Sequence, residues 1–93
     1  MLTLDTVVHI PSAVSSGFVE HSAVLLNKKT NQYYMLDEVG ARLWELLRDG
    51  KSLRDSHQVL LEEYAVEPAR LEQDVLELLE DLGQHGLVEI DPA

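Results

Sequence analysis

Histidine and cysteine, the residues that most often bind metals, do not form a metal-binding pattern in this sequence. The four histidines are His9, His21, His57 and His85. No two of them form an HxxxH or HExxH pair, and the chain has no cysteine. A four-ligand zinc site would therefore have to be assembled from distant segments. We expect no metal ion and no other cofactor.

Acidic side chains and serines are the remaining candidates for catalysis. The acidic series is Glu72, Asp74, Glu77, Glu80 and Asp81. This series is typical of the solvated face of an amphipathic helix, and nothing in the sequence indicates the pocket that a general acid–base pair requires. The serines at positions 12, 15, 16 and 22 lack the GxSxG context of a nucleophile. The sequence thus predicts a protein that is not an enzyme.

The length and charge of the chain limit its fold and its partners. Its 93 residues, 45% of them hydrophobic, suffice for one domain over residues 1–93 with a modest core. Seven basic against seventeen acidic residues give a formal net charge of −10, which repels nucleic acids and anionic membranes. No apolar run approaches the ~20 residues of a membrane span, and no export signal is visible. We expect a cytoplasmic protein that binds neither nucleic acid nor membranes.

The first third of the chain predicts β-strands. Residues 6–10 are rich in β-branched side chains and end at Pro11, which cannot donate to a strand ladder. Residues 12–17 resemble a small-residue connector, residues 18–27 a second strand and residues 33–36 a third. The polar turn between the last two predicts a β-hairpin. In the third strand, alternation places Tyr34 and Leu36 on one face and Tyr33 and Met35 on the other.

From Asp37 onward, the apolar residues follow a helical period. Asp37 is predicted to cap a first helix, and Gly50 is predicted to end it. Ser52 is predicted to begin a second helix, with Asp55 in a capping-box-like position. Pro68 suits the first turn of a third helix. The chain then turns into a short final strand at residues 87–90, so the order of elements is β-β-β-α-α-α-β.

The third helix, residues 68–83, has more apolar surface than one core contact needs. Its predicted core stripe is Leu71, Val75, Leu78 and Leu82. Leu76 and Leu79 lie outside this stripe, and the whole apolar arc spans about 160°, against the ~100° that one core requires. Either the helix is wedged between two other elements, or part of the arc is exposed and binds an apolar ligand.

Three helices followed by a wing are typical of a winged helix-turn-helix, here with strands packed beside it. DNA recognition by such a fold needs basic side chains that reach phosphates and base edges. The third helix has Arg70 as its one basic residue, amid an excess of acidic residues. The charge therefore argues against DNA binding.

An acidic carrier protein with a phosphopantetheine arm is an alternative of another class. The length, the acidity and the Asp55-Ser56 dipeptide fit such a carrier. However, His57 replaces the apolar residue expected there, and Ser56 falls inside a predicted helix rather than at its start. The strands of the first third also have no place in a four-helix carrier.

Peptide recognition needs no catalytic residue and suits the third strand. An exposed edge strand offers free amides and carbonyls to an incoming extended peptide, which can add to the sheet as another strand. A neighbouring helix with surplus apolar width would form the second wall of such a groove.

Two segments resemble the PqqD-like proteins, which are recognition elements of ribosomally made, post-translationally modified peptide (RiPP) pathways. The segments are "YYMLDEVGARLWELLRDGKS" and "EEYAVEPARLEQDVLELLEDLGQHGLVEI". In the first, the family pattern is met at Tyr34, Leu36, Asp37, Gly40, Ala41, Leu43 and Trp44. In the second, it is met at Tyr64, Val66, Leu71, Asp74, Val75, Leu78, Leu79, Leu82, Gly86, Leu87 and Val88.

The resemblance implies an α+β fold, a winged helix-turn-helix with a three-stranded antiparallel sheet followed by three helices and a short C-terminal wing strand. It also implies a non-catalytic adaptor that binds the leader peptide of a precursor as an extra strand beside the third strand and the third helix. The implied peptide-binding residues are Gln32, Tyr33, Tyr34, Met35, Leu36, Leu71, Asp74, Val75, Leu78 and Leu79.

Among free-standing members of this family, the sequence is most similar to the small leader-binding partner of the lasso-peptide leader peptidase. The implied partners are a precursor leader peptide and that peptidase or another maturation enzyme. A peptide chaperone of the pyrroloquinoline quinone pathway is the close alternative. We expect a monomer, with strand swapping between two chains as the alternative.

Overall fold

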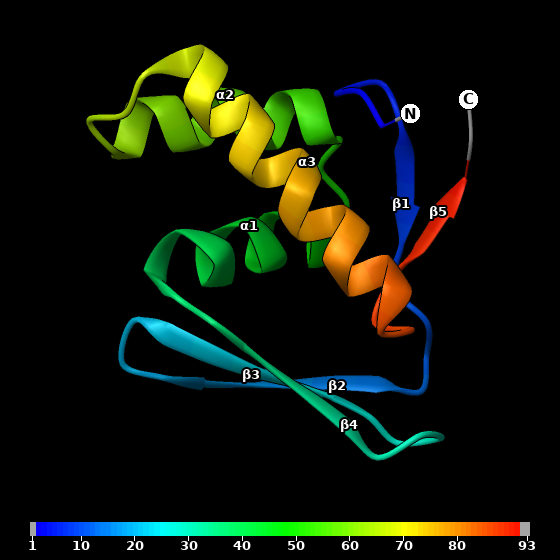
Figure 1. Ribbon diagram of the computed structural model, residues 1–93. Coiled ribbons are helices and arrows are strands. Elements are labelled where there is room, and N and C mark those ends of the chain that lie inside the picture. Colours follow the sequence, from blue (N-terminus) through cyan, green and yellow to red (C-terminus); the bar gives the residue numbers. More distant parts are fainter. Residues whose placement is uncertain (1, 92–93) are drawn as a thin grey trace.

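Two small antiparallel sheets and three helices make up the computed structural model, which describes residues 2–91 (Figure 1). The elements follow in the order β1 (Val7–His9), β2 (Val14–Val19), β3 (Ser22–Asn27), β4 (Gln32–Leu36), α1 (Glu38–Arg48), α2 (Leu53–Glu63), α3 (Pro68–Gln84) and β5 (Glu89–Asp91). The helices lie together on one side of the sheet formed by β2, β3 and β4. The predicted fold class is confirmed. None of these helices is both long and apolar enough to cross a membrane.

The three-stranded sheet, in the order β2-β3-β4, is built from different residues than the sequence predicted. The segment predicted as one strand, residues 18–27, is two strands joined by a tight turn in which Val19 pairs with Ser22. Glu20 makes this turn possible with a positive φ of 57°. Since neither turn residue is Gly, Asn or Asp, the usual hairpin signal was absent. Residues 14–17, predicted as connector, form most of β2 because they pair with the apolar strand β3.

The first predicted strand belongs to a separate two-stranded sheet. β1 pairs with β5 antiparallel, with Val8 opposite Ile90. The wing after α3 is therefore completed by the N-terminal part of the chain. The prediction that residues 6–10 join the three-stranded sheet was wrong, because Pro11 and the turn after it separate β1 from β2.

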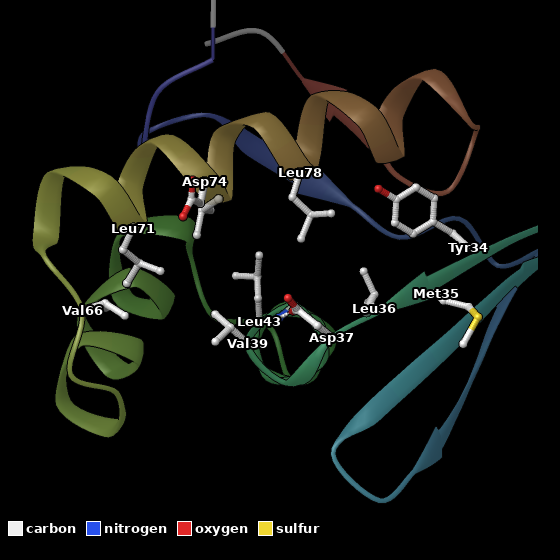
Figure 2. A pocket seen from close by; sticks show the side chains of 12 residues that line it. Tyr34, Met35, Leu36, Asp37, Val39, Leu43, Val66, Leu71, Asp74 and Leu78 are labelled. Atoms are coloured by element: carbon white, nitrogen blue, oxygen red, sulfur yellow. Dashed lines mark hydrogen bonds between the residues drawn. The ribbon is translucent and has the colours of Figure 1, made fainter.

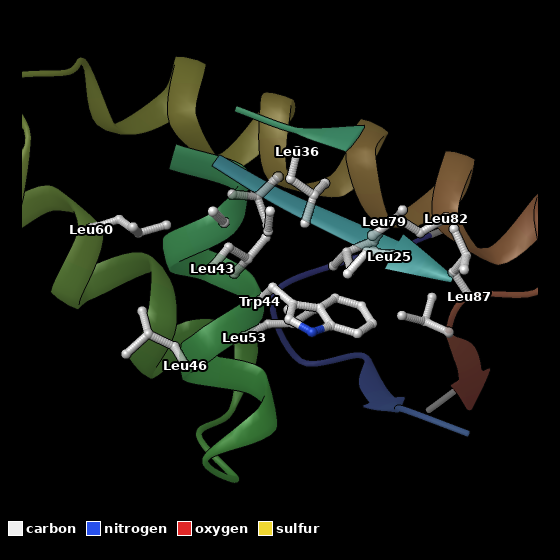
Figure 3. Close-up of a cluster of buried hydrophobic side chains, with 14 of the residues drawn as sticks. Leu25, Leu36, Leu43, Trp44, Leu46, Leu53, Leu60, Leu79, Leu82 and Leu87 are labelled. Carbon is white, nitrogen blue, oxygen red and sulfur yellow. The ribbon is translucent and has the colours of Figure 1, made fainter. Parts of the chain in front are cut away.

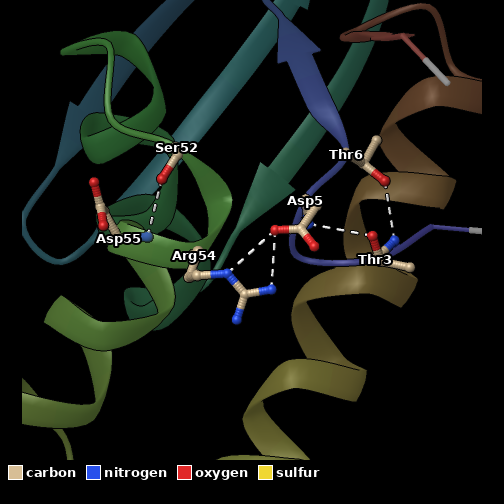
Figure 4. A network of polar contacts seen from close by, with 6 residues as sticks. All are labelled: Thr3, Asp5, Thr6, Ser52, Arg54 and Asp55. Atoms are coloured by element: carbon tan, nitrogen blue, oxygen red, sulfur yellow. Dashed lines mark hydrogen bonds and ion pairs between the residues drawn. The ribbon is translucent and has the colours of Figure 1, made fainter. Parts of the chain in front are cut away.

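The predicted helix boundaries are confirmed by their capping contacts. The Asp37 carboxylate accepts a hydrogen bond from the Gly40 amide at 2.9 Å, and the Ser52 hydroxyl accepts one from the Asp55 amide at 3.1 Å (Figure 4). Gly50 has a φ of +92°, the left-handed conformation that follows a helix end. Each cap satisfies an amide that the first turn of its helix leaves free.

The N-terminal segment is fixed to α2 by polar contacts (Figure 4). The Thr6 hydroxyl accepts from the Thr3 amide at 2.9 Å and closes a turn. The Arg54 guanidinium donates to the Asp5 carboxylate at 2.9 Å, which joins this turn to α2. Both charged side chains are mostly exposed, so this ion pair positions the segment more than it stabilises the fold.

Leucines from all three helices and from β3 surround Trp44 in the core (Figure 3). Trp44 is 2% exposed, and Leu25 and Leu60 are fully buried. On α3, the buried residues are Leu71, Val75, Leu79 and Leu82. Leu79 therefore takes the core position that was predicted for Leu78, which is only half-buried. The reason is the wide apolar arc: the core uses the side of the arc that includes Leu79, and Leu78 is left at its margin.

Asn27 links the end of β3 to the chain after α3. Its amide nitrogen donates to the Gly86 carbonyl at 2.8 Å, and its amide oxygen accepts from the Lys29 amide at 3.0 Å. The side chain is 7% exposed, so both groups depend on these partners rather than on water. One side chain thus shapes the β3–β4 turn and holds the wing against the sheet.

We predict that Asn27→Ala lowers the free energy of unfolding by about 1–3 kcal/mol, because it leaves the Gly86 carbonyl and the turn amide without their partner. Urea denaturation followed by circular dichroism measures the change. Gln32→Ala, at the exposed position opposite Asn27 in the hairpin, is the matched control and should leave the stability close to wild type. Equal stability of both variants would contradict this role of Asn27.

Candidate functional site

A groove runs along the free edge of β4, between this strand and α3 (Figure 2). Its volume is about 450 Å³. The lining residues come from β4, the first half of α1, the α2–α3 loop and α3: Tyr34, Met35, Leu36, Asp37, Val39, Gly40, Leu43, Val66, Leu71, Asp74, Val75 and Leu78. We call this feature the groove.

The base of the groove forms because β4 passes directly into α1. Leu36 is the last residue of β4 and is 4% exposed. Asp37 follows it and caps the helix, so the first turns of α1 begin at the end of the strand. Val39 and Leu43, one helical turn apart, then continue the apolar surface that Leu36 begins.

The opposite wall of the groove is the margin of the apolar arc of α3. Leu71 and Val75 contribute the edges of buried side chains, and half-buried Leu78 points from the helix toward β4 (Figure 2). The structure shows where the two sides of this wide arc lie. Part of it packs in the core, and part of it lines the groove.

The chemistry of the groove is apolar, with acidic groups at its rim. Its titratable side chains are Tyr34, Asp37 and Asp74. Asp37 is engaged as the cap of α1, and Asp74 lies 3.8 Å from Arg70 on the surface of α3. Within residues 2–91, no three His, Cys, Asp or Glu side chains are grouped so as to hold a metal ion. The groove offers apolar contacts and main-chain hydrogen bonds.

The two edges of the three-stranded sheet differ in what covers them. β4 pairs with β3 on one side and has no strand on the other among the described residues. β2 is the opposite edge, and its inner face is covered by Arg48, whose guanidinium lies 5.3 Å from the Phe18 ring centre and donates to the Ser16 hydroxyl. An apolar groove therefore lies beside the β4 edge. At the β2 edge, by contrast, the Arg48 side chain covers the inner face of the strand.

A hydrogen bond between Tyr34 and Asp81 closes one end of the groove. The Tyr34 hydroxyl donates to the Asp81 carboxylate at 2.5 Å and so joins β4 to α3. The edge of the His85 ring packs against the Tyr34 ring, with 5.5 Å between centres. Nδ1 of His85 lies 2.8 Å from the Asp81 carbonyl oxygen, so Nδ1 carries the proton. We call this contact of Tyr34 with Asp81 the clasp.

The clasp shifts the titration of the tyrosine. The hydrogen bond to Asp81, then burial, then the negative charge of Asp81 raise the pKa of Tyr34 from 10.0 to about 12. All three causes favour the neutral phenol, which is the form that can donate. The phenol therefore donates across the whole physiological pH range.

The structure places seven of the ten sequence-predicted residues in the groove, and these define one continuous surface. Gln32 and Tyr33 are exposed outside it, although they belong to the same edge strand. Leu79 is fully buried in the core, so its side chain does not reach the groove. The alternation predicted for β4 is confirmed, because Tyr34 and Leu36 face the helices and Tyr33 and Met35 face away.

Sequence reasoning missed the residues that form the base of the groove: Asp37, Val39, Gly40, Leu43 and Val66. The sequence predicted Asp37 only as the cap of the first helix, and it indicated no role in peptide binding for Val39 or Leu43. The signal that could have found them is the absence of any loop between the edge strand and this helix. Without a loop, the first turns of the helix must lie beside the strand.

Ser56 decides against the carrier-protein alternative. This serine lies within α2 and is fully buried. A phosphopantetheine arm needs a serine that a transferase can reach, so Ser56 could be modified only after α2 had left the core.

We predict that Tyr34→Phe removes a pH-dependent part of the stability. Because the folded pKa of about 12 exceeds the ordinary 10.0, the clasp stabilises the fold fully below pH 10, and this contribution is lost as the pH rises through about 12. Wild type should therefore lose stability over this interval more steeply than Tyr34→Phe. Chemical denaturation at several pH values tests this.

Tyr33→Phe is the matched control, since Tyr33 sits on the same strand but is 70% exposed. Its pH profile should match that of wild type. The raised pKa of Tyr64, caused chiefly by burial, acts equally in all three proteins. Identical profiles for Tyr34→Phe and wild type would show that the clasp does not stabilise the fold.

Two solved structures are similar to this chain over most of its length. One is described as "TbiB1 in Complex with the TbiA(beta) Leader Peptide", with 34% sequence identity, a TM-score of 0.83, and coverage of 87% of this chain and 94% of that chain. The other is "Lasso peptide synthetase B1 complexed with the leader peptide", with 28% identity, a TM-score of 0.79, and coverage of 88% and 96%. A comparison with curated proteins gave no match.

The family described as "Coenzyme PQQ synthesis protein D (PqqD)" matches residues 22–88. This range begins at β3 and ends just before β5. It therefore includes β4, all three helices and every residue that lines the groove. The chain belongs to the PqqD family.

Proposed function

We propose that this protein is a non-catalytic adaptor that binds the leader peptide of a ribosomally made precursor and presents it to a maturation enzyme. The observation that carries this proposal is the unpaired edge of β4, which forms one side of an apolar groove. The peptide would bind as an added strand, with its main chain bonded to β4 and alternate side chains in the groove.

We propose that the bound peptide runs antiparallel to β4. β3 and β4 are antiparallel, and an added antiparallel strand would continue this pattern. β4 runs from the clasp toward α1, so the N-terminal part of the peptide would lie near Val66 and its C-terminal part near the clasp (Figure 2). The five residues of β4 span about 17 Å, so a peptide segment of similar length fits along them.

Both similar structures are complexes with leader peptides, which supports this class of ligand for the present groove. They are described as B1 proteins, and one as part of a lasso peptide synthetase. We therefore propose a lasso peptide pathway, with its leader peptidase as the receiving enzyme. Delivery of a precursor peptide in pyrroloquinoline quinone synthesis is the second candidate, because the family description names that pathway. Both candidates use the same groove.

Binding of the leader peptide encoded beside this gene tests the proposal directly. The purified protein should raise the fluorescence anisotropy of the labelled leader in a saturable way. Absence of saturable binding in the micromolar range would contradict the proposed function. Testing the leaders of a lasso precursor and of a pyrroloquinoline quinone precursor side by side would separate the two candidates.

We predict that Leu78→Glu weakens leader binding by more than about tenfold, or ~1.4 kcal/mol. Burial of one leucine side chain is worth about 1.5–3 kcal/mol, and the new carboxylate would have to be desolvated in the groove as well. Leu76→Glu is the matched control: Leu76 is half-buried on the same helix but does not line the groove. Equal losses in both variants would mean that the effect is not specific to the groove.

Proline substitutions in β4 test strand addition as the binding mode. Successive residues of an antiparallel strand direct their amides to opposite sides. One of Tyr34→Pro and Met35→Pro should therefore break pairing with β3 and lower the melting temperature sharply. The other should remove an outward amide, keep more of the fold and abolish leader binding. Normal leader affinity in a folded proline variant would exclude an added strand at that residue.

A further inference from the structure

The main-chain groups of β4 point alternately toward β3 and toward the free edge of the sheet. In an antiparallel pair, opposite residues alternate between pairs that exchange two hydrogen bonds and pairs that exchange none. The residues of an exchanging pair direct both amide and carbonyl toward the partner strand, and their chain neighbours direct both away from it. One hydrogen bond of known direction therefore assigns every residue of β3 and, through the register, every residue of β4.

The two ends of β3 supply such hydrogen bonds. Directly after β3, the Lys28 amide donates to the Ala13 carbonyl at 2.9 Å, on the side of β2. At the other end, Val19 and Ser22 pair across a two-residue turn, and the closing pair of such a turn is hydrogen-bonded. Both ends agree, because Ser22 and Lys28 lie an even number of positions apart. The residues of β3 that bond to β4 instead of β2 are Ala23, Leu25 and Asn27.

The register carries this assignment to β4. The residues opposite Ala23, Leu25 and Asn27, which bond back to β3, are Leu36, Tyr34 and Gln32. The turn agrees with the assignment, because the Asn27 carbonyl accepts from the Asn31 amide at 2.8 Å, on the side of β4. Tyr33 and Met35 lie between these residues. Their amides and carbonyls therefore point to the free edge, where no strand lies within residues 2–91.

These free main-chain groups border the groove. Met35 lines the groove although its side chain is 73% exposed and points away from it (Figure 2), so its main chain is the part that faces the groove. Tyr33 lies two positions earlier in the same strand, which places its groups about 7 Å away. This is the spacing of alternate residues in any extended peptide. The edge thus offers two donors and two acceptors in the pattern of a strand ladder.

We infer that Tyr33 and Met35 are the residues of β4 that hold the bound peptide, each through two main-chain hydrogen bonds. The amide of each would donate to the carbonyl of the peptide residue opposite it, and its carbonyl would accept from the amide of that same residue. This inference rests on the proposed function, because it assigns the residues that pair with the same ligand at the same edge.

The assignment also divides the peptide residues into two alternating sets. Opposite residues in a sheet direct their side chains to the same face. The peptide residues opposite Tyr33 and Met35 would therefore bind through their main chain and direct their side chains away from the helices. The residues opposite Leu36 and Tyr34 would direct theirs into the groove, the first toward its base and the second toward Leu78 beside the clasp.

Amide hydrogen exchange measured by NMR tests the inference on the protein itself. In the free protein, the amides of Tyr33 and Met35 should exchange at least tenfold faster than that of Tyr34, which is bonded to β3. A saturating amount of the leader peptide encoded with the precursor should slow Tyr33 and Met35 at least tenfold. The amide of Phe18 is the matched control. Phe18 lies opposite Ala23, so its amide points to the free edge of β2 and should stay fast with the leader bound.

Leader analogues with one amide at a time replaced by an ester test the same inference from the side of the peptide. An ester lacks the donor, so affinity measured by anisotropy should fall about three- to tenfold at two positions that are two residues apart. Alanine substitution should reduce affinity at positions that alternate with these, where the side chains enter the groove. Ester-sensitive and alanine-sensitive positions that coincide would contradict the assignment.

The remaining outcomes separate this inference from the proposed function. Saturable leader binding that leaves the amides of Tyr33 and Met35 fast would overturn the inference and leave the groove as the binding site. Slow exchange of these two amides in the free protein would also overturn it, because they would already be bonded to β3 or to a second copy of the chain. Absence of saturable leader binding would overturn the proposed function, and the inference with it.

Discussion

The direct passage of β4 into α1 is the constraint on which the rest of the structure depends. Leu36 is buried as the last residue of the strand, and Asp37 satisfies an amide of the helix that begins immediately after it. Only the capping residue Asp37 separates the two elements, so the start of the helix must stay beside the end of the strand. The base of the groove and the position of α1 against the inner face of the sheet both follow from this junction.

The second wall of the groove is held at a fixed distance by contacts at both of its ends. At one end α3 is anchored in the core by Leu71 and Val75, and at the other the clasp joins it to β4. A site that is formed before its ligand arrives does not spend binding energy on ordering its own walls. This matters for a protein of 93 residues, whose core is small and whose total stability is modest.

The sequence was informative where the physical cause is local. Asp37, Gly50 and Ser52 mark helix ends by chemistry that acts over three or four residues, and the alternation in β4 needs only the strand itself. The sequence did not predict contacts between residues that lie far apart along the chain. The pairing of β1 with β5, and the clasp between residues 47 positions apart, depend on the complete fold.

Two wrong predictions also arose because the cause lies outside the local sequence. The turn at Glu20 has no conventional turn residue, and only the pairing of β2 with β3 reveals it. Leu71, Val75 and Leu82 keep their predicted core positions. The exchange of Leu78 for Leu79 reflects only a small rotation of α3 about its axis, which helical periodicity cannot determine when the apolar arc is wide. The sequence therefore predicted the strand and the helix that line the groove, but it did not predict the residues at the base of the groove.

The pairing of β1 with β5 also determines how this domain can be joined to others. Val7 lies opposite Asp91, so the two ends of the fold are adjacent, and neither strand contributes a residue to the groove. A neighbouring domain attached at either end, or a short peptide that connects the two ends in a circular permutant, would therefore leave the walls of the groove unchanged.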